Sequence, residues 1–158
     1  MSKGTLKNKI IDMINKEKLH IEKKEKYNKV RIIMIIQIVD QLFTLHYNNI
    51  IYRDLKPNNI IIDHDSNIHI GDFDLAVNNS NEITSEMTSS IGSPFFSAPE
   101  SSSHNIYTFE SDIFSLGRII YFIYTGEIRE CKNYLNIFGN EKIRNLCNQS
   151  KCSLYVAA

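Results

Sequence analysis

One short stretch restricts the folds open to this chain more than any other. It is residues 51–62, Ile-Tyr-Arg-Asp-Leu-Lys-Pro-Asn-Asn-Ile-Ile-Ile, in which Asp54, Lys56 and Asn59 lie between two apolar runs. The second run, Ile60–Ile62, and a later one, Ile68–Ile70, flank a cluster of turn-forming residues, so the pattern predicts a small β-hairpin. A lone Asp in a loop is most often a turn former or a helix cap. Any function therefore depends on the combination of these residues.

Two further motifs follow this loop in order, Asp-Phe-Asp at residues 72–74 and Ala-Pro-Glu at residues 98–100. Together with Tyr-Arg-Asp at residues 52–54, they resemble the catalytic loop, the Asp-Phe-Gly motif and the Ala-Pro-Glu motif of eukaryotic-type Ser/Thr protein kinases. The resemblance covers residues 5–126 and is to the C-terminal lobe alone. It implies a mainly α fold of the α+β family, with a buried central helix and a small β-hairpin that carries the catalytic and metal-binding loops.

The resemblance assigns the chemistry to four residues and an apolar contact with the nucleotide to a fifth. Asp54 would accept the hydrogen bond of the substrate hydroxyl, and Lys56 would offset charge on the transferred phosphoryl group. Asn59 and Asp72 would hold Mg²⁺ against the phosphates of ATP, since Mg²⁺ prefers hard oxygen ligands. Ile61 would lie beneath the adenine ring. The implied reaction is ATP-dependent phosphorylation of Ser and Thr hydroxyls on a protein substrate.

A substrate-binding role and regulatory roles follow from the same resemblance. Ser93 takes the place of a Thr that contacts the catalytic loop and would bind substrate. Ser89 lies where many kinases carry an activating phosphate, and Arg53 would be the partner of that charge. The alternative for Ser89 is an ordinary solvated Ser/Thr loop, and the sequence leaves both open.

Structural support comes from four further positions. Tyr52 replaces the family's His and can pack on Phe73, while Asp112 would brace the catalytic loop through hydrogen bonds. Glu100 of the Ala-Pro-Glu motif is the fourth, although the Arg that pairs with it in the family is not recognisable. His46 is expected to pack or to cap a helix and not to act as a base.

Hydrophobic spacing predicts helices on both sides of the loop. One begins near Leu6, a second runs over residues 30–47, and a third, residues 112–125, is apolar nearly all round and should be buried. The mixed-charge run 16–29 is expected to form a solvated turn and a helix start. In the second helix the expected buried face comprises Ile32, Ile35, Ile36, Val39, Leu42, Phe43 and His46.

The expected domain organisation is a partial kinase domain over residues 1–126 and a poorly matched C-terminal extension of the same lobe over residues 127–158. No Gly-rich loop and no N-lobe Lys or Glu are recognisable, and Asp74 stands where the family has Gly, which tolerates torsions that other residues avoid. The chain should therefore have weak activity or none. The alternative to an enzyme is a kinase-derived pseudoenzyme or scaffold that binds a partner protein.

Composition narrows the class of partner. Lys plus Arg and Asp plus Glu both number 18, so no excess positive charge is available to bind nucleic acid or an anionic membrane. No signal-peptide pattern is recognisable, and no run approaches the roughly 20 uninterrupted apolar residues of a membrane span. The three cysteines are odd in number and lack a metal-binding spacing. We expect a cytoplasmic protein, with the nucleus as the alternative.

Overall fold

The computed structural model describes residues 4–78 and 95–128 of the 158-residue chain. By internal contacts the chain divides into two compact units, residues 1–128 and 129–158, and all described residues belong to the first. The domain boundary expected after residue 126 stays a prediction. Ser89 and Ser93 lie outside the described residues.

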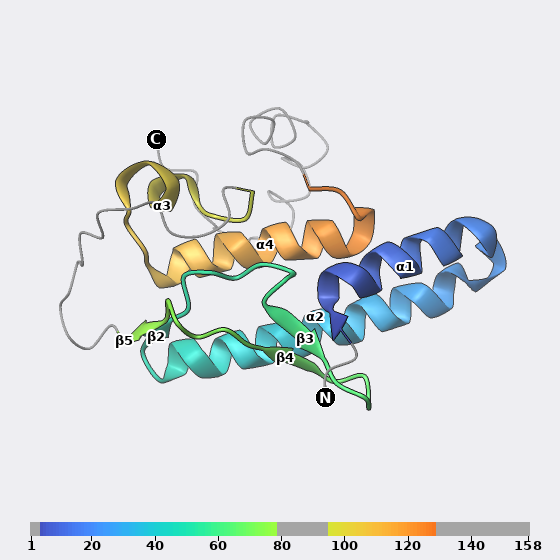
Figure 1. Ribbon diagram of the computed structural model, residues 1–158, viewed down its shortest axis with the longest axis horizontal. Coiled ribbons are helices and arrows are strands. Elements are labelled where there is room, and N and C mark those ends of the chain that lie inside the picture. The colour runs from blue at the N-terminus through green and yellow to red at the C-terminus, as the bar shows by residue number, and fades with distance from the viewer. Residues whose placement is uncertain (1–3, 79–94, 129–158) are drawn as a thin grey trace, which may run out of the picture. The chain divides into compact units, whose positions relative to one another are not determined.

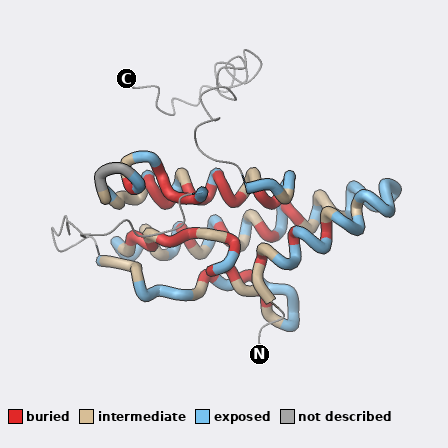
Figure 2. Tube along the Cα trace, turned by 45° about the horizontal axis from the view of Figure 1, so that its top comes forward, coloured by how far each residue is buried: buried red, intermediate tan, exposed pale blue. Residues whose placement is uncertain are grey.

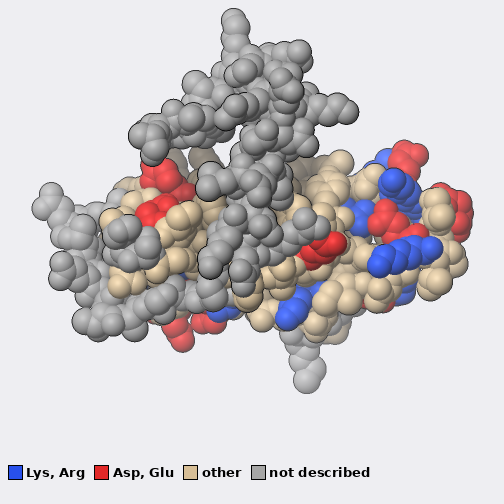
Figure 3. Space-filling view, turned by 90° about the horizontal axis from the view of Figure 1, so that it is seen from above, with Lys and Arg blue, Asp and Glu red and all other residues tan. Residues whose placement is uncertain are grey.

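The first half of the unit is a pair of helices that lie side by side (Figure 1), α1 (Leu6–Leu19) and α2 (Lys24–Tyr47), joined by the short 3₁₀ helix η1 (Ile21–Lys23). Leu6, Ile10 and Met13 form the buried stripe of α1, at helical spacing. The mixed-charge run forms the end of α1, the turn and the start of α2. Acidic and basic side chains alternate at that end of the molecule in Figure 3, as expected of a solvated connection.

The predicted buried face of α2 is wrong in part. Ile32, Ile36, Val39 and Phe43 are 41–65% exposed, whereas the buried residues are Arg31, Met34, Ile38 and Leu42. The helix is apolar over most of its surface, so periodicity could not select its inner face. The tertiary partners of its few polar residues determine that face instead.

The window Ile21–Tyr47 is the one helical segment among the described residues with the length and mean hydropathy of a membrane span. A core helix of a globular domain can have the same composition. Arg31 on this helix bonds to the later helix α4 (Phe109–Thr125), and Gln37 and Gln41 bond to the strand β4 (Ile68–Ile70). These contacts are those of a helix that packs within a domain.

Two small antiparallel sheets contain the strands that flank the segments with Asp54 and Asp72. In the first, β1 (Gly4–Thr5), β3 (Ile60–Ile62) and β4 (Ile68–Ile70) lie in the order β1-β3-β4, and β3 and β4 form the predicted hairpin with Ile61 opposite His69. Asp63 closes its turn by accepting hydrogen bonds from the backbone of Asp65 and Asn67 and from His69. In the second sheet β2 (Ile50–Ile51) pairs with β5 (Val77–Asn78).

Two helices follow, α3 (Pro99–His104) and α4 (Phe109–Thr125). A capping box between Thr108 and Ser111 begins α4, and Gly126, with φ of 69°, ends it. The inner side of α4 is buried, but Ile113 is 50% exposed and Tyr124 46% exposed, so the expectation of all-round burial is correct for one side only. Buried residues concentrate where α4, α2, α1 and the loop after β2 meet (Figure 2).

Candidate active site

The loop between β2 and β3 brings the predicted residues Asp54, Lys56 and Asn59 together. The amide of Asn59 donates to Oδ2 of Asp54 at 2.8 Å and to its backbone oxygen at 3.1 Å, and Lys56 Nζ lies 2.5 Å from the same Oδ2. Asp54 is 6% exposed. Its other oxygen, Oδ1, is buried and has no hydrogen-bond partner within residues 4–78 and 95–128. One oxygen is thus fixed by protein groups while the second can still accept a hydrogen bond.

Asp112, at the start of α4, braces this loop as predicted. Its Oδ2 accepts from the backbone N–H of Tyr52 at 2.8 Å, and its Oδ1 accepts from that of Arg53 at 2.9 Å. Arg53 has φ of 70°, a conformation costly for a residue with a long side chain. His46 also bonds to Asp112, at 2.9 Å, and packs on Phe109, so it is the packed histidine that we expected. The buried carboxylate therefore holds the strained backbone immediately before Asp54.

Tyr52 connects the loop to the segment that carries Asp72. Its hydroxyl donates to the backbone oxygen of Gly71, and its ring meets Phe73 edge to face with centroids 5.4 Å apart. The predicted packing of Tyr52 on Phe73 is confirmed. Burial raises the pKa of the Tyr52 hydroxyl far above its ordinary value, so the group stays protonated and continues to donate.

Asp72 is exposed and has φ of 59°, within the left-handed region that Asp tolerates better than most residues. The residue before it is confined: Gly71 N–H donates to Asn59 O at 2.9 Å, and a Cβ at Gly71 would lie 2.9 Å from Cδ1 of Ile61. Asp74 lies within a turn closed by Ala76 N–H and Phe73 O at 3.0 Å, and its φ is not positive. In this conformation the backbone at residue 74 does not require glycine.

Asn59 and Asp72 suit Mg²⁺ by donor chemistry. The amide nitrogen of Asn59 donates to Asp54, so the amide oxygen of Asn59 is the atom that could bind a metal ion. Asp72 offers an exposed carboxylate. Hard oxygen donors in small number, completed by phosphate oxygens and water, are what Mg²⁺ prefers. No group of three or more His, Cys, Asp or Glu residues that could hold a metal ion occurs in the described part of the chain.

The remaining predicted residues lie around this centre. Arg53 donates from Nε to the backbone oxygen of Leu75 at 2.6 Å, and its guanidinium lies over the ring of Tyr107. Ile61 is partly buried in β3, and Glu100 lies in the first turn of α3. The predicted roles of these three residues in regulation, nucleotide contact and support stay predictions.

Sequence reasoning missed three polar residues that support the site. Arg118 of α4 is 5% exposed and donates from Nε to Phe95 O at 2.6 Å, which ties α4 to the segment before the Ala-Pro-Glu motif. Gln37 and Gln41 of α2 bond to the backbone of β4. Polar residues isolated in apolar helices were the available signal, because such residues need a buried partner.

Comparison with known proteins gives the family. A family model described as protein kinase domain matches residues 2–153. The chain is 38% identical over 92 residues to the Serine/threonine-protein kinase PrkC of Bacillus subtilis, covering 58% of this chain and 14% of that protein. It is 42% identical over 85 residues to the Rhodopsin kinase GRK1 of Rattus norvegicus, covering 54% of this chain and 15% of that protein. It is 39% identical over 90 residues to the Serine/threonine-protein kinase RUNKEL of Arabidopsis thaliana, covering 56% of this chain and 7% of that protein.

Three observations agree on one class of protein. The described domain is mostly helical with small antiparallel sheets, the loop motifs occur in the order seen in kinases, and the family model matches nearly the whole chain. The chain belongs to the protein kinase domain family. The match extends beyond residue 126, where sequence motifs alone had failed. The aligned region spans about a seventh of the length of PrkC and of the Rhodopsin kinase. ATP and Mg²⁺ are the usual cofactors of this family.

Proposed function

We propose that this chain is the C-terminal lobe of a Ser/Thr protein kinase domain, and that it carries the residues for ATP-dependent phosphorylation of protein Ser and Thr hydroxyls. The order of its elements supports the assignment to this lobe. The loop with Asp54, the hairpin β3–β4 and the Asp72 segment follow one another, and the buried α4 packs against the first of them.

The state of the Asp54 carboxylate is the observation that carries the proposal. Lys56 and Asn59 hold Oδ2, which leaves the buried Oδ1 to accept the hydrogen bond of a substrate hydroxyl and orient its oxygen. A buried carboxylate oxygen without a partner is costly for stability. Its retention is expected where a ligand supplies the missing hydrogen bond.

Asn59 and Asp72 would hold the metal, and Lys56 would remain near the transferred group. When bound, Mg²⁺ with ATP supplies the phosphoryl group and neutralises its charge. The protein's own contribution is positioning, through Asp112 on the backbone of Tyr52 and Arg53 and through Tyr52 on Gly71. No Gly-rich loop or N-lobe Lys is recognisable in the sequence, so we expect slow transfer from this chain alone.

The test is transfer of labelled γ-phosphate from ATP to pooled Ser, Thr and Tyr peptides in the presence of Mg²⁺. Asp54→Asn, which preserves shape, should lower the rate by about 10²- to 10⁴-fold, the usual contribution of a positioned acid–base group. Asp65→Asn, on the exposed turn of the hairpin, is the matched control and should leave the rate unchanged. Equal rates for wild type and Asp54→Asn would refute the proposal.

The alternative is a kinase-derived scaffold, and the outer face of α2 favours it. Ile36, Phe43 and Tyr47 are 60%, 65% and 78% exposed. Contiguous exposed apolar side chains often mark protein-binding surfaces. A partner retained equally by wild type and Asp54→Asn but lost by Phe43→Ser, with no phosphoryl transfer detected, would favour the scaffold.

Partners and location remain parts of this proposal. The partner is a protein substrate, or the bound protein in the scaffold alternative. The cytoplasm is the proposed location, with the nucleus as the alternative.

A further inference from the structure

Within the residues that the structure describes, the outer edge of β4 is satisfied by side chains and not by another strand. β4 pairs with β3, and Gly71, which follows it, donates its N–H to Asn59 O on that side. Because backbone groups alternate in direction along a strand, Ile68 and Ile70 point theirs away from β3. Both residues are buried, at 2% and 7% exposure, so these groups need protein partners.

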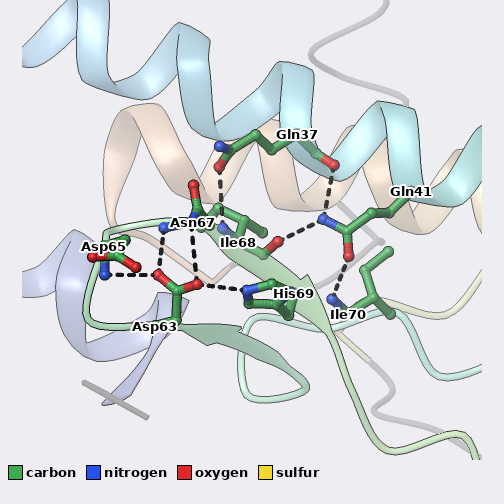
Figure 4. Close-up of polar contacts among 8 residues, drawn as sticks. All are labelled: Gln37, Gln41, Asp63, Asp65, Asn67, Ile68, His69 and Ile70. Carbon is green, nitrogen blue, oxygen red and sulfur yellow. Dashed lines mark hydrogen bonds and ion pairs between the residues drawn. The ribbon is translucent and has the colours of Figure 1, made fainter.

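Two glutamines one turn apart on α2 supply those partners (Figure 4). Gln37 Oε1 accepts from Ile68 N–H at 3.1 Å, Gln41 Nε2 donates to Ile68 O at 2.6 Å, and Gln41 Oε1 accepts from Ile70 N–H at 2.9 Å. Gln41 Nε2 also donates to Gln37 O at 3.1 Å, which fixes the rotation of its amide. The amide of Gln41 thus grips β4 through both a donor and an acceptor.

The hydrogen bond of Gln41 to Ile70 lies two residues before the proposed metal ligand, Asp72. Ile70 is held by Gln41, Gly71 N–H by Asn59 O and Gly71 O by the hydroxyl of Tyr52. Asp72 follows directly, in a left-handed conformation with φ of 59°. A residue with such backbone torsions keeps its direction only if the preceding residues are fixed. Of these groups, Gln41 is the one that lies on a helix outside the loop, on α2.

We propose that Gln41, assisted by Gln37, is a positioning residue that aims the Asp72 carboxylate at the metal. The inference rests on the proposed function, in which Asp72 is a metal ligand. In this role Gln41 would act through the backbone of Ile70 and Gly71 and not by direct contact with substrate or metal. Its effect should exceed that of Gln37, because Gln41 bonds two residues before Asp72 and Gln37 four residues before it.

The test measures Mn²⁺ binding to the full 158-residue chain by paramagnetic broadening of backbone amide signals, with Mn²⁺ alone as the probe. Gln41→Met removes the amide at similar volume and should raise the Mn²⁺ concentration for half-broadening near Asp72 by about tenfold, as loss of an outer-shell partner usually does. Gln37→Met is the matched variant and should have the smaller effect. Asp40→Asn, on the exposed neighbouring position of α2, should have none.

The outcomes separate the two proposals. Urea unfolding of each variant tells a loss of stability from a loss of metal binding: a merely structural role would lower the unfolding midpoint and leave the Mn²⁺ titration unchanged, which would overturn the positioning role alone. Wild type without broadening near Asp72 would overturn both that role and the metal role of Asp72. If Gln41→Met does not fold, Gln41→Asn, which withdraws the same amide by one methylene, replaces it.

Discussion

The two ends of the α2–α4 pair use buried charge for different purposes. At one end, Asp112 at the start of α4 accepts from the N–H groups of Tyr52 and Arg53, and from His46 of α2. At the other end, Arg31 of α2 donates from Nε to Ile123 O near the end of α4 and bonds to Glu17 of α1 at 2.5 Å. The first charge shapes a loop with strained backbone, and the second joins three helices.

The difference lies in what each charge satisfies. Ile123 O is one of the last carbonyls of α4, which lack partners within the helix, and a cation there also interacts favourably with the helix dipole. The two backbone N–H groups that Asp112 satisfies belong to a loop that has no regular structure of its own. Removing Arg31 should therefore loosen helix packing, whereas removing Asp112 should release the proposed active site.

The largest expected effect is that of Asp112→Ala. A buried and a partly buried N–H group lose their acceptor and the left-handed Arg53 loses its restraint, so the free energy of unfolding should fall by about 4 kcal/mol. Urea denaturation checks this value. Amide exchange in residues 52–54 should accelerate more than in α1. A loss below about 1 kcal/mol would mean that the loop is held by other contacts.

Arg31→Met should have the next largest effect on the free energy of unfolding. Arg31 is 2% exposed, and its removal deprives both Glu17 and Ile123 O of a partner, at a cost of about 3 kcal/mol. Amide exchange in residues 52–54 should not change, in contrast to Asp112→Ala. Lys29→Met, which breaks the exposed pair with Glu25, is the control and should cost no more than about 0.5 kcal/mol.

His46→Phe should have a smaller effect, because it keeps an aromatic ring against Phe109 and removes only the hydrogen bond to Asp112. We expect a loss of about 1 kcal/mol by urea denaturation. In the Asp112→Ala background the same change should cost nearly nothing. Additive losses in the double variant would show that His46 acts by packing alone.

The smallest effect concerns pH at the Arg31 end. The hydrogen bond from Arg31 lowers the pKa of Glu17 from its ordinary value of 4.5. A carboxyl group whose pKa is lowered on folding contributes stability above its unfolded pKa and loses it as pH falls through the folded value. The stability difference between wild type and Glu17→Gln should thus be constant above about pH 5 and shrink below pH 4.5. A difference independent of pH down to 3 would contradict this reading.

Sequence predicted the features that depend on neighbours along the chain. The strands Ile60–Ile62 and Ile68–Ile70 follow from apolar runs bounded by turn residues, and the grouping of Asp54, Lys56 and Asn59 follows from their place in one loop. The inner face of α2 could not be predicted. It depends on Arg31 and Gln41, whose partners lie 92 and 27 residues away, and no local pattern encodes such distances. Asp112 was predictable only through the family resemblance.

The contacts of Asp112 also determine the order in which parts of the molecule can fold. They join residues 59, 60 and 66 positions apart in the chain, so the loop cannot acquire its bonded geometry until α4 has been synthesised and has docked. Contacts across such separations form late, after the entropy of closing a long loop has been overcome. On the ribosome, the helical hairpin α1–α2 can form while residues 52–54 remain unrestrained. A nascent chain that stops before residue 112 therefore lacks the brace on which the Asp54 loop depends.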